Sequence, residues 1–180
     1  MILIVLAGLC IATVPLTGGR LTALAELRLR ALPVPILALA LQVVLVSIVP
    51  GGNHQLHADL HIVTYVLIGL FLIANRHIPG VPLIAAGAAT NALAIAVNSG
   101  VMPAARTAQR LAGLAETGHV FHNSAALAHP QLLWLGDIIP VPGPLPNVLS
   151  LGDCAIFLGM LVLLHRASRP QVAQAVPAAG

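Results

Sequence analysis

The chain has 180 residues, of which 58% are hydrophobic and only 7% are charged, and its mean hydropathy is +0.98. Soluble domains average about 25% charged residues, so this composition excludes a protein that can cover its whole surface with polar side chains. The net charge of +3 is carried by scattered arginines without any lysine, which argues against a nucleic-acid-binding patch and is typical of a GC-rich bacterium. The composition predicts a single membrane domain.

The first apolar run covers residues 2–17 and ends before Gly18-Gly19-Arg20. A secretory signal peptide is the rival interpretation, but the run lacks a basic leading segment and a clear small-residue cleavage site. We therefore expect a retained first helix. In residues 20–30, leucines at helical spacing alternate with charged residues, which indicates a short amphipathic helix lying in a membrane interface. An anionic-lipid site would need more basic residues than this segment holds.

Further apolar runs lead us to expect an all-α polytopic integral membrane protein with about five transmembrane helices, since ~20 residues cross a bilayer. The expected spans are approximately residues 2–17, 31–50, 60–74, 81–98 and 148–164. Residues 99–147 are too rich in charge, histidine and proline for a span, and we expect a long extracytoplasmic loop. Within it, the apolar segment Leu132–Ile139 is too short to cross, so it either dips into the protein or lies at the interface. Residues 170–180 form the expected cytoplasmic tail.

Arginine counting predicts the orientation, because cytoplasmic loops carry an excess of positive charge. Five alternating spans place six arginines on one side and two on the other. The six are Arg20, Arg28, Arg30, Arg76, Arg166 and Arg169, and the two are Arg106 and Arg110. The sequence therefore predicts a protein of the bacterial cytoplasmic (inner) membrane, with the N-terminus outside and the C-terminus inside.

Most polar side chains outside the arginines lie between Asn91 and Asp153. Asn91 and Asn98 are seven residues apart, about two helical turns, and share one helix face. If Leu132–Ile139 folds back, the acids of two Leu-Gly-Asp tripeptides, Asp137 and Asp153, would meet the end of that helix. Amides and acids at such depth need partners, and an intramembrane acid indicates a site.

These considerations give a candidate ligand-binding cluster with a plain structural alternative. The candidate residues are Asn91, Asn98, Asp137, Ser150 and Asp153. In the alternative, Ser150 or Asn147 caps the last helix and Asp153 is favourable in its first turn. The sequence leaves both interpretations open.

Histidines supply weaker candidates for a metal site. His57 and His61 are four residues apart, and His119 and His122 are three apart; such pairs with a carboxylate can bind zinc or copper. Histidines are also common near membrane interfaces, so the metal remains unknown. Without a Gly-x-Ser-x-Gly elbow or a phosphate-binding glycine loop, we assign no catalytic residue, and the cofactor is unknown.

Several short patterns occur together in this chain. They are Asn98-Ser99-Gly100-x-Met102-Pro103, Leu135-Gly136-Asp137-x-Ile139-Pro140 and Ser150-x-Gly152-Asp153, with His61, Tyr65, Asn75, Pro79-Gly80 and Asn91, and more weakly Gly18-Gly19-Arg20-Leu21. The combination resembles a family of small polytopic bacterial membrane proteins of unknown function. The resemblance implies a membrane domain but no activity, substrate or cofactor.

The leading functional hypothesis is a non-enzymatic integral membrane module that binds a small ligand at an outward-facing Asn/Asp cluster, or that acts as an accessory subunit of a membrane complex. The expected partners are the lipid bilayer and either a membrane protein or a second copy of the chain, with no nucleic acid. One alternative is a small cation-coupled transporter. Another is a metal-dependent membrane enzyme that uses the outer histidines.

Overall fold

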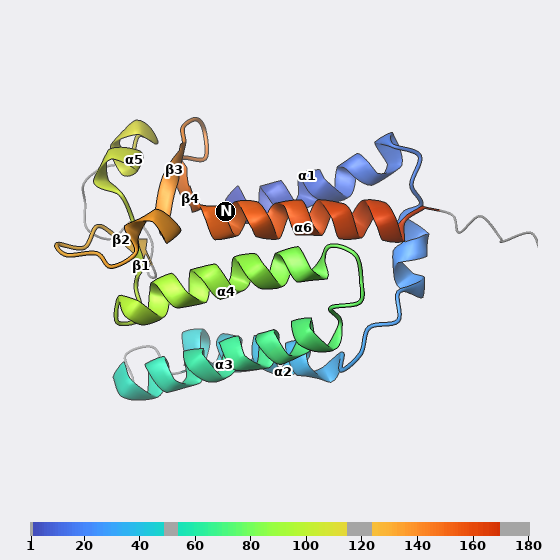
Figure 1. Ribbon diagram of the computed structural model, residues 1–180, viewed down its shortest axis with the longest axis horizontal. Helices are drawn as coiled ribbons and strands as arrows, with labels where there is room; N and C mark the ends of the chain where they lie inside the picture. The colour runs from blue at the N-terminus through green and yellow to red at the C-terminus, as the bar shows by residue number, and fades with distance from the viewer. Residues whose placement is uncertain (1, 49–53, 115–123, 170–180) are drawn as a thin grey trace, which may run out of the picture.

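The computed structural model of the protein describes residues 2–48, 54–114 and 124–169. Its long helices lie roughly along the longest dimension of the molecule (Figure 1). They are α1 (Ile2–Leu16), α2 (Pro33–Ile48), α3 (His54–Ala74), α4 (Val81–Val97) and α6 (Leu151–Ala167). The 3-10 helix η1 (Leu21–Glu26) lies at one end of these helices, and the strands lie at the other end with the short helix α5 (Arg106–Leu111) (Figure 1).

Helix α6 is the element against which most of the fold is arranged. Its start is defined by a capping box, in which the Ser150 side chain accepts from the backbone N–H of Asp153 and the Asp153 side chain accepts from that of Ser150; this pairing satisfies two N–H groups that the helix leaves free. His165 and Arg166 lie in its last turn, where positive charge is favourable against the helix dipole.

Helices α4 and α6 touch through their backbones at glycines. A Cβ atom at Gly87 would lie 2.4 Å from the carbonyl oxygen of Gly152, and one at Gly159 would lie 2.7 Å from that of Gly80. Gly80 also has a φ of +92°, a conformation that other residues adopt at a steric cost. Small residues are therefore required at this contact because any side chain would push the two helices apart.

Apolar clusters extend this pair on both sides. Cys10 and Val14 of α1 pack with Leu164 of α6. On the other side, Leu72 of α3, Ile78 and Val81 form a second buried cluster that Leu163 also contacts. Helix α6 thus shares one cluster with α1 and another with α3 and α4.

The strands form two small two-stranded sheets at the start of α6. Strand β1 (Met102–Pro103) pairs in parallel with β2 (Ser124–Ala125), and β3 (Asp137–Val141) pairs antiparallel with β4 (Asn147–Ser150). The register places Asp137 opposite Ser150, with an irregularity between Asp137 and Ile139. The two sheets meet at an isolated parallel bridge between Ala104 and Asp137.

The prediction of about five transmembrane helices is wrong, because no helix in the described ranges is both long and apolar enough to cross a membrane. Helices α1, α2, α4 and α6 have 15, 16, 17 and 17 residues. At ~1.5 Å per residue these lengths fall short of a hydrocarbon core of ~30 Å. Helix α3 reaches 21 residues, but its first turns hold three histidines and an aspartate.

The predicted location and orientation of the protein are wrong for the same reason as the predicted fold class. A polytopic membrane protein, placement in the inner membrane, and an N-terminus outside with a C-terminus inside all depended on those spans, and the same finding contradicts them. The apolar runs are nevertheless helical where the structure describes them. The observed helices are close to the expected ranges, and the error was to treat apolar runs of this length as spans.

The segment expected to be a long loop contains regular structure. In residues 99–147 the structure has β1, α5, β2, the 3-10 helix η2 (Leu133–Leu135) and β3. The apolar segment Leu132–Ile139 folds back onto the end of α4, where Leu135 is buried with Ala94 and Met102. In place of the amphipathic helix expected over residues 20–30, the structure has the shorter 3-10 helix η1. It has six residues, and none of them is buried.

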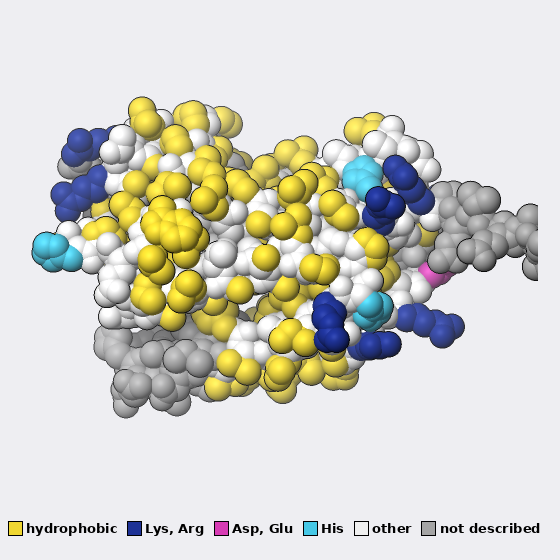
Figure 2. Space-filling view, viewed as in Figure 1, with side chains coloured by type: hydrophobic (Ala, Val, Ile, Leu, Met, Phe, Trp, Pro, Cys, Tyr) yellow, Lys and Arg dark blue, Asp and Glu magenta, His cyan; other side chains and the backbone are white. Residues whose placement is uncertain are grey.

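Many large apolar side chains are exposed on the long helices, and one such face is shown in Figure 2. Leu16 is 83% exposed, Ile4 72% and Leu39 66%. The low charge of the chain has this direct structural consequence, because there are too few polar side chains to cover the molecule.

Candidate functional site

Asn91, Ser150 and Asp153 form one hydrogen-bonded network between α4 and the start of α6. The Asn91 side-chain N–H donates to Asp153 Oδ1 at 2.8 Å, and the Ser150 hydroxyl donates to Asn91 Oδ1 at 2.8 Å. The Ser150 backbone N–H donates to Asp153 Oδ2 at 3.1 Å, and the Asp153 backbone N–H donates to Ser150 Oγ at 2.9 Å. The three side chains therefore bind one another, and they join two helices.

The structure shows the capping arrangement that the sequence offered as the alternative for Ser150 and Asp153. It adds Asn91, which the sequence placed near these residues without a defined partner. Gly152 makes the contact possible, because a Cβ there would lie 2.0 Å from Asn91 Oδ1. Helix capping and helix pairing thus account for the hydrogen bonds of these three residues.

Asn98 has a separate structural role at the end of α4. Its side-chain N–H donates to the carbonyl oxygens of Ala94 at 2.7 Å and Gln131 at 2.8 Å, and its Oδ1 accepts from the Gln131 backbone N–H at 2.8 Å. Asn98 therefore fixes the chain at Gln131, just before η2, and lies apart from the network of Asn91.

Asn75 repeats this geometry at the opposite end of the helices. Its Oδ1 accepts from the Arg30 backbone N–H at 2.8 Å, and its N–H group donates to the carbonyl oxygens of Arg30 at 2.9 Å and Phe71 at 2.8 Å. The side chain is fully buried. Asn75 was part of the family resemblance but not of the predicted site. The sequence signal that could have identified it is an asparagine at the end of an apolar run with a glycine and a proline soon after it, a pattern that Asn98 shares.

Asp137 is the member of the predicted cluster whose chemistry is most perturbed. It is buried, with 7% of its surface exposed, and it accepts a hydrogen bond from the Ser124 hydroxyl. Loss of hydration on burial, together with the nearby negative charge of Asp153, raises the pKa of Asp137 to about 6 although the Ser124 hydrogen bond opposes this rise. Asp137 therefore changes protonation close to neutral pH, unlike an ordinary carboxyl group.

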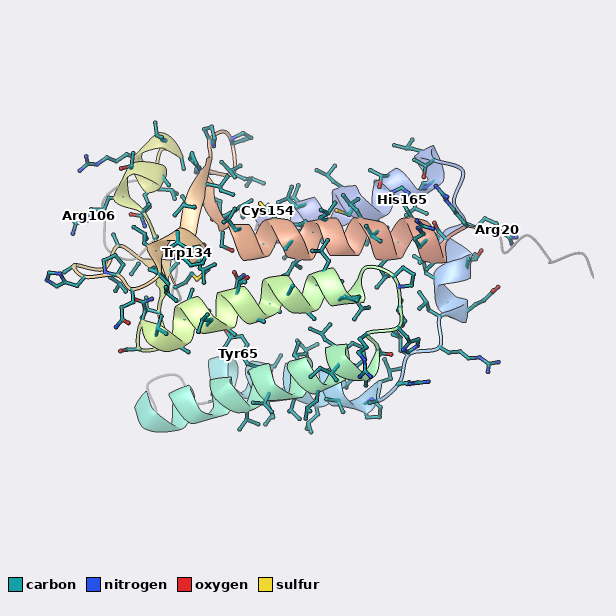
Figure 3. The ribbon with its side chains drawn as sticks, viewed as in Figure 1. Arg20, Tyr65, Arg106, Trp134, Cys154 and His165 are labelled. Atoms are coloured by element: carbon teal, nitrogen blue, oxygen red, sulfur yellow. The ribbon has the colours of Figure 1, made fainter. Side chains whose placement is uncertain are left out.

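The position of Asp137 brings three chain segments together. Its carbonyl oxygen accepts from the Ala105 backbone N–H at 2.9 Å, Ser124 contributes the side-chain hydrogen bond, and Ser150 lies opposite in the β-ladder. Figure 3 shows the neighbouring Trp134 at this end of the helices, with His165 and Arg20 at the other end. A change of charge at Asp137 thus acts where β1, β2 and β4 meet.

The predicted metal ligands receive no support from the described part of the chain. His119 and His122 lie outside the described residues, and for His57 and His61 only the backbone in α3 is described. No group of three or more histidine, cysteine or acidic side chains that could hold a metal ion occurs among the described residues. His165 contacts the hydroxyls of Thr13 at 2.9 Å and Thr17 at 3.0 Å and so joins α6 to α1.

The comparisons with known proteins identify a family rather than an activity. An uncharacterised protein of Thermotoga maritima is 35% identical over 101 residues, which is 55% of this chain and 58% of the relative, so the match covers little more than half of that protein. No solved structure matches the chain. A family model described as a family of unknown function matches residues 26–165. Because this match covers well over half of the chain, the protein belongs to the family of unknown function DUF5317.

Proposed function

We propose that this protein is a non-enzymatic binding module whose small ligand is a cation held at Asp137 beside Asp153. The observation that supports the proposal is the burial of the Asp137 carboxyl group close to a second carboxylate. Two negative charges in a site with little water repel each other. Their repulsion is relieved by a positive charge, which is either a proton or a bound cation.

The cost of this arrangement is itself an argument for a role in binding. Near neutral pH the ionised form of Asp137 lowers the stability of the fold, because its pKa is raised on folding to about 6. A buried charge that lowers stability where a neutral acceptor would make the same hydrogen bond is characteristic of functional sites. An asparagine at this position would keep an oxygen acceptor for Ser124 without the charge.

The surrounding groups have the chemistry of a site for a hard cation. The Ser124 hydroxyl contacts Asp137 directly, and Ser150 lies opposite Asp137 in the β-ladder. Carboxylate and hydroxyl oxygens are ligands of hard cations such as Mg²⁺ and Ca²⁺. The Ser124 hydroxyl donates its hydrogen bond to Asp137, so the hydroxyl oxygen keeps lone pairs that can face a cation.

Thermal unfolding of the full chain with different cations tests the proposal. NaCl, KCl, MgCl₂ and CaCl₂ would be compared at pH 7.5 with tetramethylammonium chloride of equal ionic strength. We expect at least one of the four to raise the unfolding midpoint of the wild type and to leave that of Asp137→Asn unchanged. Glu26→Gln, which removes an exposed carboxylate at the opposite end, should keep the response. Equal midpoints in all five salts would contradict the proposal.

A second proposal, that the protein is an accessory subunit of a larger complex, is supported by its exposed apolar side chains. Leu16 of α1 and Leu39 of α2 are among the most exposed of these, and apolar surface of this kind favours contact with a partner. Purification from the native source without harsh extraction would test it. A stoichiometric protein partner is expected, and a chain that elutes alone at its monomer mass would contradict it.

A further inference from the structure

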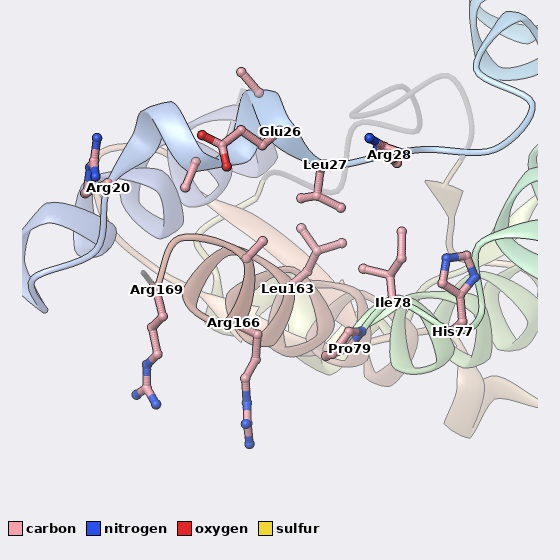
Figure 4. A pocket seen from close by; sticks show the side chains of 13 residues that line it. Arg20, Glu26, Leu27, Arg28, His77, Ile78, Pro79, Leu163, Arg166 and Arg169 are labelled. Carbon is pink, nitrogen blue, oxygen red and sulfur yellow. The ribbon is translucent and has the colours of Figure 1, made fainter. Parts of the chain in front are cut away.

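A cleft of about 1250 Å³ lies at the end of the molecule opposite to Asp137. Three segments that are far apart in the sequence line it, namely η1 with the residues around it, the connection between α3 and α4, and the end of α6. Figure 4 shows these segments around Leu27, Ile78 and Leu163, whose side chains lie between η1 and the helices. The cleft is absent from the sequence-based predictions because no single segment contains it.

Hydrogen bonds hold the three segments in fixed positions. The Arg20 backbone N–H donates to the Ser168 carbonyl oxygen at 2.9 Å and attaches the start of η1 to the end of α6. Asn75 binds both backbone groups of Arg30 and attaches the residues after η1 to the end of α3. The backbone positions around the cleft are therefore set before any ligand binds, which lowers the entropic cost of binding.

The rim of the cleft is strongly basic. Arg20, Arg28, Arg166 and Arg169 line it with one acid, Glu26, and the five groups leave a net charge of +3. All five are exposed, and none of the four arginines forms an ion pair with another residue of the described ranges. Arginine binds phosphate oxygens through paired N–H groups. Figure 4 shows Arg166 and Arg169 extending in the same direction from the end of α6.

The floor of the cleft is apolar, in contrast to its rim. Leu27 and Leu163 pack onto the buried cluster of Leu72, Ile78 and Val81. A pocket with an apolar floor and a few charged groups at its edge is the usual form of a small-molecule site. Exposed arginine side chains can turn toward an anion in the cleft, and the conformational cost is that of ordering them.

We infer that this cleft binds a phosphate-bearing ligand, with the arginines contacting the phosphate group and Leu27 and Leu163 contacting any apolar part of the molecule. Residues 20–30 alone hold too few basic residues for such a site. The fold supplies the missing charge, because Arg166 and Arg169 at the end of α6 line the same cleft as Arg20 and Arg28. In Figure 4 the side chains of Arg166 and Arg169 extend away from η1, and they turn toward the cleft when an anion binds. The site is separate from Asp137 and does not depend on the function proposed there.

The test is a titration of the full chain with two probes, followed by NMR shifts or calorimetry. Inorganic phosphate represents a free anion, and dihexanoyl phosphatidic acid below its micelle concentration represents a phosphate on an apolar body. Arg166→Gln with Arg169→Gln removes two exposed charges from the rim. Arg76→Gln with Arg106→Gln is the matched control, because both residues are exposed arginines outside the cleft lining.

We expect the rim variant to raise the Kd of at least one probe by about tenfold or more, because it removes two charge-assisted contacts, whereas the control changes the Kd less than threefold. Tighter binding of phosphatidic acid would indicate an amphiphilic ligand, and equal binding of both probes would indicate a free phosphate. Failure of both probes to bind the wild type would overturn the inference. Equal losses in the rim variant and the control would overturn it as well, because only the overall charge would then matter.

Discussion

The carboxyl group of Asp137 couples stability to pH with a definite sign. Its pKa rises from 3.8 to about 6 on folding, so the folded state holds its proton more tightly than the unfolded state. The associated stability is fully present below pH 3.8 and is lost as the pH rises through 6. A shift of this size corresponds to roughly 3 kcal/mol at most.

Replacing Asp137 with asparagine should remove this dependence. We expect Asp137→Asn to match the wild type near pH 4 and to exceed its free energy of unfolding by ~2–3 kcal/mol at pH 8. Urea denaturation of both proteins at several pH values between 4 and 8 provides the measurement. If the two stability profiles run parallel over this range, the burial of an ionisable group at this position does not have the assigned effect.

The amide of Asn98 should be sensitive to the loss of its hydrogen-bond donor. Asn98→Asp keeps an oxygen acceptor for Gln131 but loses the bonds donated to Ala94 and Gln131. We expect a loss of ~2–4 kcal/mol in the free energy of unfolding, since a buried carbonyl without a partner costs ~1–3 kcal/mol. Asn147→Asp is the control, because the Asn147 side-chain oxygen accepts a hydrogen bond from the Val148 backbone N–H, and aspartate retains this acceptor. Similar losses for both variants would refute this role of Asn98.

At the scale of elements, the backbone contact between α4 and α6 determines how the polar side chains meet. A methyl group at Gly87 would lie within 2.4 Å of the Gly152 carbonyl oxygen. We therefore expect Gly87→Ala to lower the free energy of unfolding by ~1–3 kcal/mol through overpacking, as measured by thermal or urea unfolding.

Gly69 supplies the matched control for Gly87. It lies inside α3, and a Cβ there would meet no atom within 4 Å. Gly69→Ala should leave stability unchanged or raise it by up to ~1 kcal/mol, because alanine is the better helix former. Equal effects of the two substitutions would show that the close approach of α4 and α6 is not required.

The positions of the helices along the chain were largely predictable from the sequence, but whether they cross a membrane or pack in a bundle was not. The apolar runs gave helices close to the expected ranges, because a long run of helix-compatible apolar residues has few other structures available. The run ending at residue 50 and the one starting at residue 60 show where this prediction fails, because both were expected to be spans. Apolar composition alone does not distinguish a helix that crosses a bilayer from one that packs in a bundle, and no helix in the described ranges is both long and apolar enough to cross.

The contacts of the candidate site were predicted only in part, because local sequence patterns do not specify which distant segments meet. Spacing on one helix face drew attention to Asn91, and the capping signal identified Ser150 and Asp153, which do meet. Asn98 shares that face by spacing, but it binds the chain at Gln131 instead. The choice between these partners depends on how residues 124–135 return to α4, and no local pattern encodes that return.

At the scale of the whole molecule, opposite ends carry different chemistry. Asp137 and Asp153 lie near the start of α6, and Arg166 and Arg169 lie at its end, which is ~25 Å away along the helix. Charges at that distance are largely screened at physiological salt. We expect the titration of Asp137 to be unchanged in the variant carrying Arg166→Gln and Arg169→Gln; a shift of its pKa by a unit would indicate that the two ends are coupled.

A carboxyl ¹³C NMR titration of Asp137 in the full chain tests the proposed binding of a cation most directly. The signal is assigned by its loss in Asp137→Asn, and the titration is run in tetramethylammonium chloride and then in the cation that stabilises the protein. The predicted result is a pKa near 6 in the first salt and a lower pKa in the second, because a bound cation favours the ionised carboxylate. A pKa near the ordinary value of 3.8, or one near 6 that no cation lowers, would contradict a cation site at Asp137.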